Sequence, residues 1–170
     1  MEFAKIVFLS IAAAICYGIL HDQVTARICV EYFTVFHPPV FYTDNPTLLG
    51  LGWGVIATWW LGAFLGVVLA ISARAGHSRK VTARELVRPV SQLLALMAIS
   101  ALVFGTAGYV LARRGRIAPP LWITRSLESH AYNAFMADWW AHNASYAAAT
   151  LGGIVLCVMT YRKRVSAPLQ

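Results

Sequence analysis

Long apolar stretches alternate with short polar ones along the whole chain. The apolar stretches cover approximately residues 3–20, 47–73, 83–112 and 127–161. About 20 apolar residues in a helix are enough to cross the ~30 Å hydrocarbon core of a bilayer. The pattern therefore predicts an all-α fold, an integral membrane four-helix bundle that forms one domain over residues 1–170.

The first and fourth helices are predicted to extend beyond the membrane. No glycine or proline interrupts residues 19–37, so the first helix is expected to continue from residue 3 to residue 36. At ~1.5 Å per residue, this helix would be roughly 50 Å long. The fourth helix, over residues 127–161, is expected to project on the same side.

The predicted helix starts carry side chains that cap free backbone N–H groups. These are Asp44 or Asn45 before Pro46 for the second helix, Thr82 with Glu85 for the third, and Ser126 for the fourth. Pro38 and Pro39 are expected to end the first helix, because proline does not continue an α-helix.

Basic residues give the orientation. With both termini inside, nine Lys and Arg residues flank the spans on the inner side and five on the outer side. Because positive flanks stay in the cytoplasm, this predicts an N-in, C-in bundle. We expect it in a bacterial inner membrane, with its polar outer end facing the periplasm.

Composition supports the membrane assignment. The chain is 59% hydrophobic and 12% charged, against roughly 25% charged residues in soluble domains. The net charge of +7 comes from clusters beside apolar segments, which is typical of membrane flanks, so no nucleic-acid partner is expected.

Candidate chemistry lies in residues 126–146, where His130, Asp138 and His142 precede an apolar run. Ionisable groups at membrane depth are costly and often functional. Asp138 and His142 are four residues apart and share a helix face, as in many metal half-sites. His21 lies at a similar height on the first helix.

These residues predict a divalent metal site of His21, Asp138 and His142, with His130 or Glu31 added. The donors suit zinc first, then iron or copper. As an enzyme, the protein would be a metal-dependent hydrolase or oxidoreductase acting on a lipid-like or amphiphilic substrate, with Asp138 or Glu31 as base.

Other interpretations stay open. Asp138 could pair with His142 or an arginine, Glu31 could pair with Arg27, and His130 could face water. Haem held between His21 and His142 ranks below a bare metal ion. The chain could instead be a structural or accessory subunit, or a proton or ion pathway.

Membrane lipid is one expected partner, and a second copy or another membrane subunit is the other. A face of small residues on the fourth helix favours close helix packing. The segments HDQVTARICVEYFTVFHPP and PTLLGLGWGVIATWW resemble a family of small bacterial four-span integral membrane proteins. This resemblance covers most of the chain and implies the fold but no activity.

Overall fold

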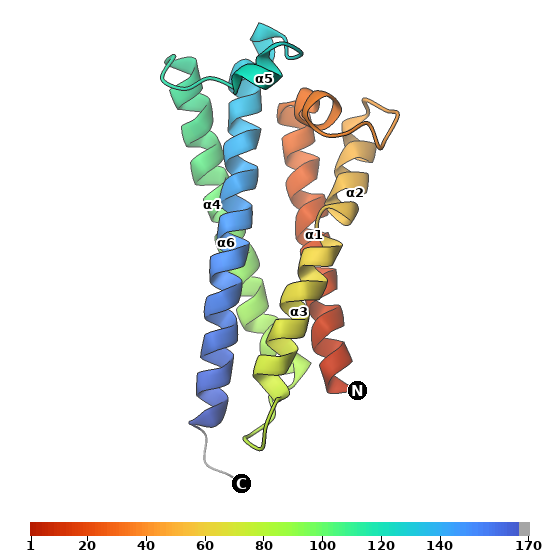
Figure 1. Ribbon diagram of the computed structural model, residues 1–170, viewed down its shortest axis with the longest axis vertical. Helices are drawn as coiled ribbons and strands as arrows, with labels where there is room; N and C mark the ends of the chain where they lie inside the picture. The colour runs from red at the N-terminus through yellow and green to blue at the C-terminus, as the bar shows by residue number, and fades with distance from the viewer. Residues whose placement is uncertain (167–170) are drawn as a thin grey trace.

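The computed structural model describes residues 1–166 and consists of helices, with no strand in that range (Figure 1). The long helices are α1 (Glu2–Ile28), α2 (Pro46–Ile56), α3 (Trp59–Arg74), α4 (Ala83–Arg113) and α6 (Tyr132–Val165). The short ones are the π-helical turn η1 (Tyr32–Phe36), α5 (Leu121–Thr124) and the 3-10 turn η2 (Ser129–Ala131).

Within the described residues, four helical segments are long and apolar enough to cross a membrane: α1, α2 with α3, α4, and η2 with α6. The start of α1 and the end of α6 lie at the same end of the bundle (Figure 1). We call this the terminal end and the opposite one the α5 end. The predicted all-α, four-span membrane bundle is therefore confirmed.

The bundle has two halves. In one half, α1 packs along α2 and α3, and in the other α4 packs along α6 (Figure 1). Small residues mark the closest approaches, since a Cβ on Gly18 would meet the Gly54 carbonyl and one on Gly62 would meet α1 at Ser10. Gly105 likewise faces Ala141 where α4 meets α6. Such residues let apolar helices pack at short distance in lipid.

The second span is broken, although its apolar pattern predicted one helix over residues 47–73. α2 ends at Ile56 and α3 starts at Trp59. The Thr58 hydroxyl donates to the Gly54 carbonyl, and the Thr58 N–H bonds the Val55 carbonyl instead. A side chain that takes the carbonyl of the fourth preceding residue interrupts the helical ladder and bends the helix.

The first helix ends earlier than residue 36. Cys29 is extended, with φ −147° and ψ 96°, and the chain then turns back over the bundle through η1. Tyr32 and Phe33 become buried against Phe135 of α6 in a hydrophobic cluster. A straight helix would have left these rings in water, and burying each stabilises the fold by roughly 2 kcal/mol.

The predicted helix starts differ in their outcome. Asn45 caps α2, and Thr82 with Glu85 forms the capping box of α4, as predicted. Ser126 does not cap the fourth span, because α6 begins at Tyr132 after η2.

Candidate metal site

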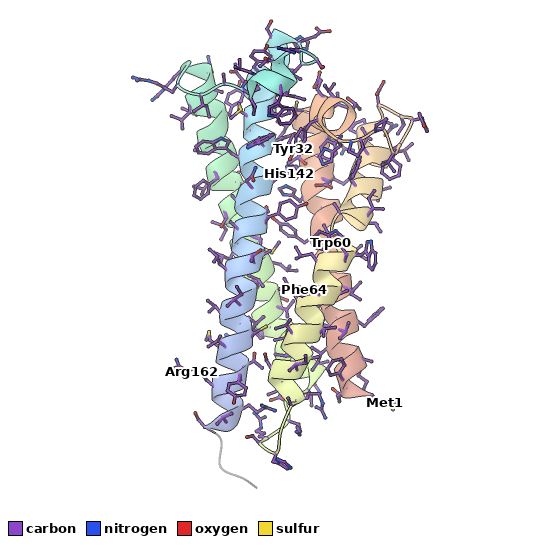
Figure 2. The ribbon with its side chains drawn as sticks, viewed as in Figure 1. Met1, Tyr32, Trp60, Phe64, His142 and Arg162 are labelled. Carbon is purple, nitrogen blue, oxygen red and sulfur yellow. The ribbon has the colours of Figure 1, made fainter. Side chains whose placement is uncertain are left out.

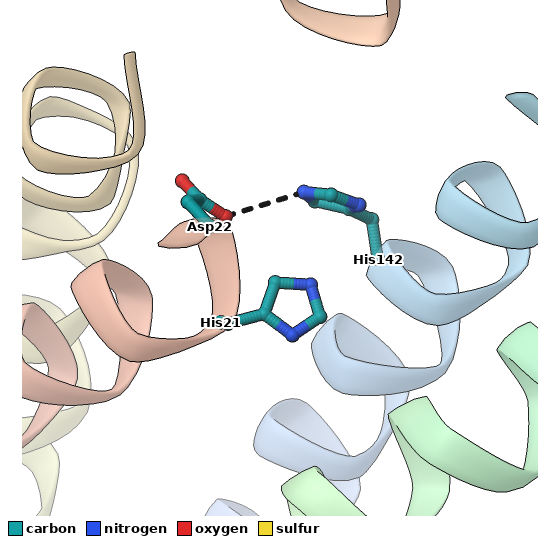
Figure 3. A group of neighbouring side chains, drawn as sticks. All are labelled: His21, Asp22 and His142. Atoms are coloured by element: carbon teal, nitrogen blue, oxygen red, sulfur yellow. Dashed lines mark ion pairs between the residues drawn. The ribbon is translucent and has the colours of Figure 1, made fainter. Parts of the chain in front are cut away.

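Three polar side chains meet between the two halves of the bundle. His21 and Asp22 come from α1 and His142 from α6, and all three point into the space between these helices (Figure 3). We call them the His–Asp–His cluster. At ~1.5 Å per residue, His21 lies roughly 10 Å below the end of α1, inside the spanning segment.

The orientation of His142 is fixed by its own helix. Its Nδ1 donates to the backbone carbonyl of Asp138 at 2.8 Å. The Nε2 atom is therefore left to face α1, where it lies 3.4 Å from Oδ1 of Asp22. A backbone carbonyl bonded to the second ring nitrogen is the usual support of a metal-binding histidine, because it sets the tautomer.

His21 has an unsatisfied nitrogen at the same place. Its ring makes edge contact with the His142 ring, with centroids 4.5 Å apart. The Nε2 atom of His21 is buried and has no hydrogen-bond partner among residues 1–166. Such an atom is rare in a folded protein and needs a partner. Tyr17 stacks on the His21 ring with centroids 5.6 Å apart, and its hydroxyl is 2.8 Å from the Ser145 hydroxyl.

The geometry of the cluster fits a small cation. One donor atom from each residue lies within 4.8 Å of the other two. Ligands on a tetrahedral zinc at ~2.0 Å are roughly 3.3 Å apart. Side-chain rotations would close that difference. Two imidazoles and one carboxylate form a common set of three ligands for zinc, which leaves a fourth position free.

Aromatic rings cover the cluster on the side of the α5 end. Tyr32 lies on the α5 side of His142 (Figure 2). Its ring stacks on His142 with centroids 4.4 Å apart, and Phe33 makes edge contact with His142. Phe36 and Phe135 continue this layer, which we call the aromatic cap. Tyr32, Phe33 and Phe135 of the cap are buried and Phe36 is partly buried, so the cap separates the cluster from water at this end.

Three ionisable side chains in the segment between α1 and α2 have shifted pKa values. Burial lowers the pKa of His37, whose Nδ1 donates to the Tyr32 carbonyl at 2.7 Å. Burial, and then the charge of Asp138, raises the pKa of the Cys29 thiol to about 12. Burial also raises the pKa of Tyr32. All three shifts favour the neutral form, as expected for side chains in an apolar layer.

The structure brings some of the predicted ligand residues together and places the others apart. His21 and His142 meet, as expected from their similar height. Asp138 is fully buried next to them, but neither of its carboxylate oxygens has a hydrogen-bond partner in the described part of the chain. Its side chain is not part of the His–Asp–His cluster.

His130 and Glu31 lie elsewhere, near the α5 end. His130 is 3.2 Å from Glu128 and 4.0 Å from Glu31, and we call these three residues the surface cluster. Glu31 accepts a hydrogen bond from the Cys29 thiol. The expected pair of Glu31 with Arg27 does not form, because Arg27 donates to Gln23 and Thr47 instead.

Asp22 was not among the predicted ligands, although the sequence carries a signal for it. Ser10, Ala14, Gly18 and Ala26 are small residues spaced by four, and Asp22 completes this series. Residues at that spacing share one helix face, and a face of small residues packs against other helices. A carboxylate in such a row is therefore directed into the bundle.

Two cavities reach His21. A partly open cavity of about 110 Å³ extends from the His–Asp–His cluster toward the terminal end, between the two halves. A groove of about 690 Å³ runs between α1, α4 and α6 and is lined by both His21 and Asp138. The cluster is therefore closed by the aromatic cap and approached from the side.

The sequence matches no known family model, and no match was found among curated proteins or solved structures. The functional argument therefore depends on the geometry of the described residues.

Proposed function

We propose that this protein binds one divalent metal ion within the membrane through His21, Asp22 and His142. Zinc is the first candidate, and iron or copper comes next. The observation that carries the proposal is the buried, unpartnered Nε2 of His21, which lies beside a carboxylate and a second imidazole of fixed tautomer.

Burial strengthens the argument. The side chains of His142 and Asp22 are only 9% and 7% exposed. Burying a carboxylate is costly, and the cost is offset only by a close positive charge or several hydrogen-bond donors. A divalent cation at this point would neutralise Asp22 and use the free nitrogens of both imidazoles.

The edge contact of the two imidazole rings favours an ion over haem. A porphyrin needs a gap between two facing rings, and these rings are in contact with centroids 4.5 Å apart.

A bound divalent ion supplies Lewis acid chemistry, and a redox-active one also supplies electron transfer. The chain's own contribution is to orient His142 through the Asp138 carbonyl and to exclude water through the aromatic cap. We propose a metal-dependent reaction on a membrane amphiphile as the activity of this site, and a location in a bacterial inner membrane with the α5 end outside.

Metal analysis of the purified protein tests the binding proposal. Wild-type protein and the variants His21→Ala, Asp22→Asn and His142→Ala are loaded with zinc, dialysed and measured by mass spectrometry of the elements. We expect about one zinc per wild-type chain and at least a tenfold loss of affinity in each variant.

His130→Ala is the matched control, because it removes an imidazole that is 71% exposed and outside the cluster. It should keep the full zinc content. Wild-type protein without stoichiometric zinc, iron or copper, or equal metal in His142→Ala and wild type, would overturn the proposal. Helical content by circular dichroism shows whether each variant is folded.

A second function, an accessory subunit of a membrane complex, has one supporting observation. Large apolar side chains such as Leu102 and Leu151 are 71% and 66% exposed. This exposure suits lipid as well as a partner, so we place it second. Copurification of a defined partner with metal-free protein would favour it.

A further inference from the structure

The groove between α1, α4 and α6 has an uneven distribution of polarity. Leu20 and Val24 of α1 line one wall, and Leu102 of α4 lines the other. Its lining includes the half-buried His21, which belongs to the His–Asp–His cluster, and the buried Asp138. We call it the membrane-facing groove. Most of its lining is apolar, and His21 and Asp138 are the imidazole and the carboxyl group in that lining.

The groove opens toward lipid rather than toward water. Leu20, Val24 and Leu102 are 69%, 60% and 71% exposed, on helices that cross the membrane. The aromatic cap covers the cluster at the α5 end. A molecule that reaches Asp138 through this groove therefore comes from within the bilayer.

Asp138 lacks the donors that a buried carboxyl group needs. It is 0% exposed, and both of its oxygens are without a hydrogen-bond partner in the range 1–166. An unsatisfied polar group in an apolar setting costs roughly 2 kcal/mol or more. Because Asp138 lies at the wall of the groove, a rotation of its side chain toward the groove lets a ligand supply the missing donor.

We propose that the membrane-facing groove binds a neutral amphiphile with a free hydroxyl group. Its hydrocarbon chain lies along α1 and α4, and its hydroxyl donates to the carboxyl group of Asp138. The amphiphile is the substrate class of the proposed metal site, so any reaction on it rests on that proposed function. Its binding depends only on Asp138 and the groove walls.

The chemistry of Asp138 selects a hydroxyl over other head groups. A hydroxyl both donates and accepts, so it satisfies a carboxyl group and leaves a lone pair for a neighbouring donor or cation. A phosphate or carboxylate head would add negative charge beside Asp22 and Asp138. A phosphocholine head has no hydrogen-bond donor, so it would leave the Asp138 oxygens unsatisfied.

Photo-crosslinking in liposomes tests the proposal. Two diazirine probes carry the same acyl chains: a diacylglycerol with its free hydroxyl, and its O-methyl ether. We expect the free hydroxyl probe to label the groove segments around Leu20, Val24 and Leu102 at least fivefold more than the ether. Equal labelling by the two probes would overturn the proposal, and this comparison needs no variant.

Asp138→Leu removes the acceptor at similar volume, and Glu128→Leu is the control at an exposed acid. Labelling by the hydroxyl probe should fall to the level of the ether in Asp138→Leu and stay unchanged in Glu128→Leu. Folded Asp138→Leu protein with full labelling would contradict the assignment.

A third probe, an isoprenoid alcohol with the same diazirine group, distinguishes the two sources of a lipid hydroxyl. Of the diacylglycerol and the isoprenoid alcohol, the one that labels the groove more strongly identifies the hydrocarbon class of the natural ligand. Repeating the experiment on protein stripped with a chelator separates the two proposals. Preferential labelling without metal supports the groove even if no metal binds, whereas bound metal without preferential labelling leaves the metal site and overturns the groove.

Discussion

The His–Asp–His cluster and the surface cluster contain the same kinds of side chain in different surroundings. In the first, His142 lies 3.4 Å from Asp22, with side chains 9% and 7% exposed. In the second, His130 lies 3.2 Å from Glu128, with side chains 71% and 82% exposed. The distances are nearly equal, so burial is what differs.

This difference decides what each pair can do. Water screens the exposed pair, and such pairs contribute from ~0 to ~1 kcal/mol. In the buried cluster the Asp22 carboxylate lies in a low dielectric, and the unpartnered Nε2 of His21 is costly as well. Only the buried cluster therefore has a physical need for a cation.

The largest expected difference between the buried cluster and the surface cluster is in stability. It is tested by removing one imidazole from each cluster in metal-free protein. His142→Ala removes the ring that stacks on Tyr32 and leaves a cavity under the aromatic cap. We expect it to lower the free energy of unfolding by about 3 kcal/mol. His130→Ala should change it by less than about 0.5 kcal/mol. Unfolding in a mixed detergent series measures both, and equal losses would contradict the contrast.

Zinc should stabilise one cluster only. At a free zinc concentration of ~100 times Kd, a single site raises the free energy of unfolding by about 2.7 kcal/mol. We expect this gain in wild type and in His130→Ala, and its loss in Asp22→Asn, which removes the carboxylate of the cluster. Melting curves with and without zinc measure it. A gain that persists in Asp22→Asn would place the zinc elsewhere.

The aromatic cap should be sensitive to acid. Burial lowers the pKa of His37 below its ordinary value of 6.5, so the folded state binds this proton less readily than the unfolded state does. His37 therefore contributes stability above pH ~6.5, and the contribution is lost as pH falls toward the lower folded pKa. His37→Phe should reduce this pH dependence, measured as melting temperature between pH 7.5 and pH 4.5.

His77 provides the control for the acid test, because it is exposed in the loop between α3 and α4. His77→Ala should keep the pH dependence of wild type. If His37→Phe keeps it as well, another group is responsible.

The smallest effect is expected at the surface cluster. Glu128→Gln removes the charge beside His130 and should change the free energy of unfolding by less than about 0.5 kcal/mol, with a smaller difference at high salt. A loss of more than about 1 kcal/mol would mean that exposure does not separate the two clusters.

Local features of the fold could be predicted from the sequence. The apolar stretches predicted the four spans, because ~20 apolar residues in lipid form a helix that satisfies their own backbone groups. The starts at Asn45 and Thr82 were predicted because a cap acts over three residues. Each of these depends on neighbours along the chain.

The broken helices could not be predicted in this way. α1 ends at Ile28 because the rings of η1 gain burial on α6, which is distant in sequence. α2 ends where Thr58 takes a carbonyl from the ladder at the tight contact of Gly54 with α1. Both outcomes depend on where another helix lies.

Part of the candidate site could likewise be predicted from the sequence, and part depended on the tertiary structure. The sequence determined that histidines and carboxylates occupy the ends of the first and fourth spans, and their depth suggested that His21 and His142 meet. Only the tertiary structure decided that Asp22 joins them while His130 stays at the surface. The rotation of each helix about its axis is set by packing small residues such as Gly18 against a neighbour, and this rotation determines which side chains face inward.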